Sequence, residues 1–170
     1  MAILFILSGF FMKYSDDLYD VNHNLLFSSI FAILCGLTCA VATVSDSGAT
    51  YVFIAILIGN LIALKVDGIH HVVSLAVFVI VCLIYGIPDF NWVILLICIL
   101  AALGDEIGHE TISNGTGNVF LNLFFEYRFL MKIIIFLLAV SGAFNISVFI
   151  CFILFEIAYM AAGMLFESLN

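Results

Sequence analysis

The chain has 170 residues, of which 66% are apolar and only 9% are charged, and its mean hydropathy is +1.34. Because soluble domains are about 45–50% apolar and about 25% charged, this composition excludes a soluble protein and predicts an integral membrane protein in contact with the lipid bilayer. The net charge of −8, with only four basic residues, also excludes nucleic acid as a partner.

Apolar runs follow one another along the chain, separated by short polar connections that include a Gly-rich turn at 113–117. The runs cover residues 2–12, 25–44, 51–64, 72–87, 92–104, a stretch within 119–141, and 146–166. A spanning helix needs about 20 apolar residues, and lipid requires each spanning segment to satisfy its own backbone hydrogen bonds. The sequence therefore predicts an all-α, polytopic membrane helix bundle of about seven transmembrane helices, forming a single domain over residues 1–170.

The basic residues indicate the orientation of these spans. Alternating spans place the connections around 13–24, 65–71 and 105–117 on one side of the membrane, and those at 45–50, 88–91 and 142–145 on the other. All four basic residues lie on or toward the first side: Lys13, Lys65, Arg128 and Lys132. By the positive-inside rule that side is cytoplasmic. We therefore expect a multi-pass protein of the cell membrane, with its N-terminus outside and its C-terminus in the cytoplasm.

Acidic residues and histidines gather at three places on this cytoplasmic side. The clusters are Asp16, Asp17, Asp20 and His23 after the first run, Asp67, His70 and His71 after the third, and Asp105, Glu106, His109 and Glu110 after the fifth. Within each cluster an aspartate is followed four residues later by an aspartate or histidine, which places both side chains on one helix face. Acids near a bilayer are costly, and a divalent cation would relieve that cost.

We therefore expect a metal site built from these clusters. The predicted ligands are Asp16, Asp17, Asp20, Asp67, His71, Asp105, Glu106, His109 and Glu110. Carboxylates favour Mg²⁺, whereas the added imidazoles also admit Mn²⁺ or Zn²⁺. The simpler alternative is that these side chains are solvated helix caps with no ligand.

The first functional hypothesis is a metal-dependent enzyme acting on the phosphate or diphosphate of a lipidic substrate, polyprenyl or phospholipid. Asp17, Asp20 and Asp105 are the predicted catalytic residues, and the four basic residues Lys13, Lys65, Arg128 and Lys132 would bind the substrate. Metal and cations together would neutralise the charge on the leaving group, and the apolar bundle would hold the lipid tail.

One motif adds a resemblance to this hypothesis. The segment Asp16-Asp17-Leu18-Tyr19-Asp20 resembles the first aspartate-rich motif of the UbiA-type intramembrane prenyltransferases, with Asp16 in place of the leading asparagine and Asn24 in place of the last aspartate. The family's second motif is half matched by Asp67 and His71, or by Asp105 and His109. The resemblance implies Mg²⁺–diphosphate chemistry and a prenyl- or lipid-phosphate transferase.

Two other hypotheses stay open. Residues 105–110 resemble the His-Glu-x-Pro-His-Glu metal motif of ZIP-type transporters, and Glu156 in the last run would give a divalent-cation transporter or channel a second station. Equally, Glu156 would pair structurally with Arg128 or Lys132. A small structural subunit of a membrane complex would use the acidic residues as interaction sites and would need no metal.

Overall fold

The computed structural model describes residues 1–112 and 118–169, and these residues form eight α-helices. The prediction of an all-α protein is confirmed, whereas the predicted turn at 113–117 lies outside the described residues. The helices are α1 (Ala2–Asp20), α2 (Leu25–Ser45), α3 (Ser47–Ile62), α4 (Ile69–Tyr85), α5 (Trp92–Thr111), α6 (Val119–Glu126), α7 (Phe129–Val140) and α8 (Ile146–Leu169).

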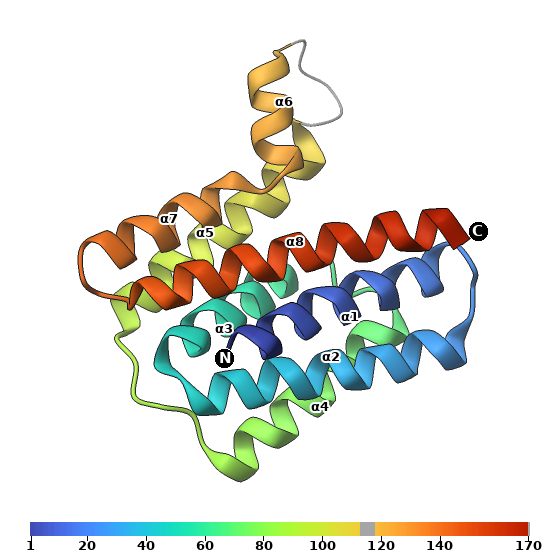
Figure 1. The fold of residues 1–170 in the computed structure, drawn as a ribbon, viewed down its shortest axis with the longest axis horizontal. Helices are drawn as coiled ribbons and strands as arrows, with labels where there is room; N and C mark the ends of the chain where they lie inside the picture. Colours follow the sequence, from blue (N-terminus) through green and yellow to red (C-terminus); the bar gives the residue numbers. More distant parts are fainter. Residues whose placement is uncertain (113–117, 170) are drawn as a thin grey trace.

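The helices pack into a bundle in which chain neighbours run in opposite directions (Figure 1). Helix α1 lies between α2 and α8, α4 packs along α2, and α3 packs on α5, which in turn contacts α7. The short helix α6 departs from the common direction and projects from the bundle (Figure 1). This alternation brings the end of α1, the start of α4 and the end of α5 toward the same end of the bundle.

Small residues allow the central helices to approach closely. A Cβ atom at Gly9 of α1 would collide with the backbone carbonyl of Phe155 in α8, and one at Gly36 of α2 would collide with that of Ser74 in α4. Such close backbone contact between small residues is typical of helix packing in lipid, where apolar side chains gain little by leaving one apolar solvent for another. These glycines therefore fix α1 against α8 and α2 against α4.

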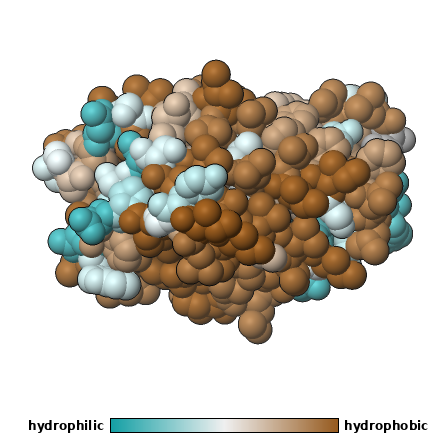
Figure 2. Space-filling model, turned by 90° about the horizontal axis from the view of Figure 1, so that it is seen from below, coloured by the Kyte–Doolittle hydropathy of each residue, from teal (hydrophilic) through white to brown (hydrophobic). Residues whose placement is uncertain are grey.

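The face shown in Figure 2 is dominated by apolar side chains, with hydrophilic residues gathered mainly at one end and a smaller number at the other. Helices α2, α5 and α8 are long and apolar enough to cross a membrane, and α3, α4 and α7 are shorter apolar helices. This pattern supports a multi-pass membrane protein whose surface contacts lipid.

Helix ends differ from the ends of the apolar runs. Helix α1 continues to Asp20 and α5 to Thr111, so their acidic clusters lie within the last helical turns instead of after them. In α1 the extension has an inner face, because Ser15 and Leu18 are both buried. The stretch 119–141 forms two helices, because the chain turns at Arg128, which has a left-handed backbone with φ 48°.

Candidate functional site

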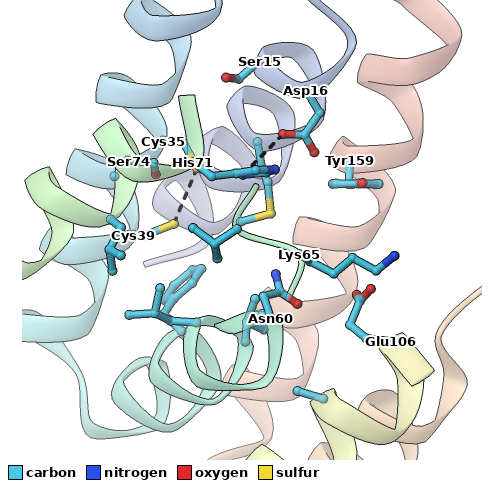
Figure 3. A pocket seen from close by; sticks show the side chains of 18 of the residues that line it. Ser15, Asp16, Cys35, Cys39, Asn60, Lys65, His71, Ser74, Glu106 and Tyr159 are labelled. Atoms are coloured by element: carbon cyan, nitrogen blue, oxygen red, sulfur yellow. Dashed lines mark hydrogen bonds and ion pairs between the residues drawn. The ribbon is translucent and has the colours of Figure 1, made fainter. Parts of the chain in front are cut away.

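The three charged clusters meet around one cavity of about 430 Å³. Three helices contribute most of the charged side chains that line it: α1 with Asp16 and Asp20, the start of α4 with His70 and His71, and α5 with Asp105, Glu106 and His109. The connection before α4 adds Lys65 and Asp67, and later parts of the chain add Arg128, Glu156 and Tyr159. Figure 3 shows Asp16 and His71 on one wall and Lys65 and Glu106 on the other. Clusters that lie far apart in the sequence therefore form a single polar site in an apolar bundle.

The wall formed by α1 and α4 contains a group that could hold a metal ion. One donor atom each from Asp16, His70 and His71 lies within 4.8 Å of the other two. Oδ1 of Asp16 is 3.2 Å from Nε2 of His70 and 4.0 Å from Nδ1 of His71. One carboxylate and two imidazoles form a donor set that suits divalent transition metals.

His70 is the most constrained member of this group. The residue is only 2% exposed, and neither ring nitrogen has a hydrogen-bond partner among the residues that the structure describes. Nε2 is close to Asp16, yet the contact lacks the alignment of a hydrogen bond, so it is an ion pair by distance only. A buried polar group without a partner is costly, so this nitrogen is available to bind a ligand.

Neighbouring residues fix the His70 ring in place. Its ring centroid lies 4.4 Å from that of Tyr19 and 3.9 Å from that of His71. Gly68 lies against the other edge, where a Cβ atom would come within 2.5 Å of His70 Nδ1. The loop before α4 therefore needs a glycine at this point to admit the ring.

His71 has an acidic residue near each ring nitrogen. Its Nδ1 faces Asp16 at 4.0 Å, and its Nε2 faces Oδ1 of Asp67 at 4.0 Å. A carboxylate behind a metal-binding histidine commonly orients the ring. Asp67 is thus placed to orient His71 from the outside of the group.

The wall formed by α5 has a different chemistry, because its acids already have partners. Asp105, which is 2% exposed, accepts hydrogen bonds from the backbone N–H groups of Leu130 at 2.9 Å and Met131 at 2.7 Å. These are N–H groups of the first turn of α7, which has no intrahelical acceptor for them. Asp105 therefore caps α7 from a neighbouring helix.

Two ion pairs continue this wall. Arg128 donates from Nε to Glu106 at 2.8 Å and from a terminal nitrogen at 3.4 Å. Burial by itself would lower the pKa of Arg128, but the neighbouring groups Glu106, Tyr159 and Glu156 together outweigh it and raise the pKa. Lys132 donates to Glu156 at 2.9 Å, which confirms the expected structural pairing of Glu156 with a basic residue.

The predicted site residues thus divide by position. Asp16 and His71 belong to the metal-capable group, and Asp20, Asp67, Asp105, Glu106 and His109 line the same cavity. Asp17 pairs with Lys13 at 2.8 Å, and Glu110 pairs with Lys65 at 3.5 Å. Of the predicted substrate-binding residues, Lys65 and Arg128 line the cavity, while Lys132 is engaged with Glu156.

His70 is the member of the metal-capable group that the predicted ligand set leaves out. The i,i+4 spacing selects His71 as the partner of Asp67, and His70 sits next to it on a neighbouring helix face. Its place in the same cluster was the only signal in the sequence, because burial depends on how α4 packs.

The fold and cavity together define a helical membrane protein with a metal-capable Asp/His/His group at one end of its bundle. Comparisons of the chain with protein-family models, with curated proteins and with solved structures found no match in any of the three.

Proposed function

We propose that this protein is a multi-pass membrane enzyme that uses a divalent metal ion to act on the phosphate or diphosphate of a lipidic substrate. The observation that carries the proposal is the cavity itself, in which the metal-capable group faces a wall containing Lys65 and Arg128. A metal ion and cations on opposite sides of one pocket suit an anionic head group, and the apolar bundle suits its polyprenyl or acyl tail.

The chemistry would follow from this arrangement. In a transfer reaction a nucleophile, water or a hydroxyl of the acceptor, forms a new bond to the lipid carbon as the bond between that carbon and the phosphate or diphosphate oxygen breaks. The electron pair leaves with that oxygen, and the proton of the nucleophile passes to water. The metal would stabilise the negative charge directly. Arg128 would contribute by sharing its guanidinium between Glu106 and the phosphate, since its five N–H donors allow more than one partner.

The orientation forms part of the same proposal. With about seven transmembrane helices, the cavity end faces the cytoplasm, since the four basic residues Lys13, Lys65, Arg128 and Lys132 lie on or toward that side. Alkaline phosphatase and green fluorescent protein fused in turn to the C-terminus test this topology. Fluorescence with no phosphatase activity supports it, and the reverse pattern contradicts it.

The activity is tested in nanodiscs with polyprenyl diphosphate and with a phospholipid phosphate, by following released phosphate or diphosphate. We expect metal-dependent release that chelation abolishes and that Asp16→Asn and His70→Gln reduce at least tenfold. The matched controls are Asp89→Asn in the connection between α4 and α5, and His23→Gln outside the cavity lining. Release that is indifferent to metal and to both site variants would contradict the proposal.

The alternative function, metal transport, can be tested with the same purified protein. Proteoliposomes loaded with a metal-sensitive dye would show flux that falls with Glu106→Gln, His109→Ala and Glu156→Gln if the cavity were a transport station. Most acids and histidines of the cavity come from helix ends at one end of the bundle. Glu156, from the middle of α8, also lines the cavity but is paired with Lys132, so we expect no such flux. Flux without phosphate release would replace the enzyme proposal.

A further inference from the structure

We infer that Asp16, His70 and His71 bind one zinc-type transition-metal ion in preference to Mg²⁺, with an open coordination position toward the cavity. The juxtaposition that carries this inference is a buried histidine with no hydrogen-bond partner beside a second histidine and a carboxylate from another helix. This inference concerns the identity of the metal. It rests on the proposed function only for the substrate that would occupy the open coordination position.

The donor set discriminates between metals. Mg²⁺ requires oxygen ligands in near-ideal octahedral geometry and usually keeps several waters. Two of the three donors here are imidazole nitrogens, which suit Zn²⁺ and its first-row neighbours. Catalytic zinc sites hold the ion with three protein ligands and leave the fourth position for water or substrate. Of the ligands predicted from the sequence, Asp16 and His71 belong to this group, and His70 joins them as the third donor.

The burial of His70 favours a ligand at this ring. A neutral imidazole has one donor and one acceptor nitrogen, and both are buried here without partners. If the ring were protonated, its charge would be buried beside a carboxylate that its N–H does not point toward. A metal ion between Nε2 and Asp16 removes the conflict at Nε2, because it binds the lone pair of this nitrogen and the carboxylate together.

The distances are close to those of a bound site. Ligands at about 2.0–2.1 Å from a tetrahedral zinc ion lie roughly 3.3 Å apart. His70 Nε2 and Asp16 Oδ1 are already 3.2 Å apart, and His71 Nδ1 must approach the same oxygen from 4.0 Å. For this pair the change is less than about 1 Å in one half-buried side chain, with Asp67 behind its other nitrogen. The donor atoms of His70 and His71, which lie within 4.8 Å of each other, must also come closer.

Metal binding by the full chain, purified in detergent and stripped with a chelator, tests the inference without any substrate. The probes are Zn²⁺ by calorimetry and Co²⁺ by its visible ligand-field spectrum, each repeated with excess Mg²⁺. We expect one ion per chain, a Co²⁺ spectrum with nitrogen ligation, and no displacement by Mg²⁺. We expect Zn²⁺ binding to weaken tenfold to a hundredfold in each of His70→Gln, His71→Gln and Asp16→Asn. The controls His23→Gln and Asp89→Asn should bind Zn²⁺ as the wild type does.

A readout of folding keeps the test decisive. Zinc should raise the Tm of the wild-type protein and of both controls, because a ligand that binds only the folded state stabilises it, and it should not raise the Tm of folded site variants. Binding of equal strength in all three site variants, or displacement by Mg²⁺, overturns the inference. If the site variants lose zinc binding as expected but the wild-type protein releases no phosphate, the proposed function is overturned and the metal site stands.

Discussion

The two walls of the cavity are built from similar residues and do different work. On the α5 wall, Asp105 and Glu106 are matched by backbone N–H groups and by Arg128, respectively. On the opposite wall, His70 and Asp16 are close together, but no hydrogen bond is formed at either ring nitrogen of His70. The acids of the α5 wall are paired within the protein and so stabilise the fold. The ring nitrogens of His70 on the opposite wall are unpaired and could bind a ligand.

This difference explains why the clusters look equivalent in sequence. Asp67 and His71 have the same i,i+4 spacing as Asp105 and His109, and that spacing only places two side chains on one helix face. Whether they serve structure or ligand depends on what the neighbouring helix presents. For Asp105 the neighbour is the first turn of α7, whereas for His71 it is the carboxylate of Asp16.

The largest expected effect tests the structural wall. Asp105→Ala should destabilise the protein by about 2–5 kcal/mol, because two buried N–H groups of α7 lose their acceptor, and Asp105→Asn should cost less since one amide oxygen remains. Thermal unfolding in detergent measures both, with the exposed Asp89→Ala as the control. If Asp105→Asn abolished phosphate release while stability stayed at the wild-type level, Asp105 would belong to the reactive wall as a catalytic residue.

The next effect concerns the Lys132–Glu156 pair, which is largely buried. Lys132→Met alone should cost about 3 kcal/mol, since it leaves a carboxylate uncompensated inside the bundle. The double variant Lys132→Met with Glu156→Met should recover most of that loss, because an apolar pair of similar volume carries no desolvation penalty. A double-mutant cycle in detergent measures the coupling. Additive losses would show that the two side chains act independently, against the pairing role.

Much of the architecture was predictable because lipid imposes it. The apolar runs at 25–44 and 146–166 correspond to α2 and α8, since only a helix satisfies its backbone in lipid. The ends of α1 and α5 were harder to place, because hydropathy marks where lipid contact stops and not where the helix stops. The break at Arg128 also escaped prediction, since a left-handed arginine has no signature in the sequence.

The sequence predicts the region of the candidate site, but it does not predict which acids and histidines approach one another there. Alternating helices bring clusters after the first, third and fifth runs to one end, and the cavity lies there. The choice among the acids depends on pairing distances. Asp17 faces Lys13 on its own helix, while Asp16, one position earlier, faces His70 across the helix interface. The 100° between neighbouring residues of a helix separates these two roles.

A smaller effect is expected at Gly68, which tests the ligand wall from behind. Its backbone is extended, with φ −98° and ψ 154°, so alanine is tolerated there by the backbone. What opposes it is the His70 ring, through Cε1 and Nδ1, and more weakly Cε1 of Tyr19 at 3.2 Å. Gly68→Ala should weaken Zn²⁺ binding about tenfold, a typical loss when a ligand's support is disturbed. Gly163→Ala is the control, because its Cβ would meet the flexible Lys13 side chain at 3.0 Å and Oδ2 of Asp17 at an ordinary contact distance of 4.0 Å. Equal affinity in both variants would show that His70 is not held as a ligand.

The smallest effect on stability is expected at the rim, where Lys65 faces Glu110 at 3.5 Å and their side chains are 38% and 63% exposed. Lys65→Gln should change the free energy of unfolding by less than about 0.5 kcal/mol, because exposed pairs are screened by water and salt. Its effect on the reaction should be larger, a raised KM for the phosphorylated lipid with kcat little changed, because Lys65 lines the cavity and would attract the head group before the chemical step. Steady-state kinetics at two salt concentrations measure this difference, with Glu110→Gln as the matched control that keeps the cation. A KM that is unchanged in Lys65→Gln would assign this lysine to the rim alone and leave Arg128 as the cation for the substrate.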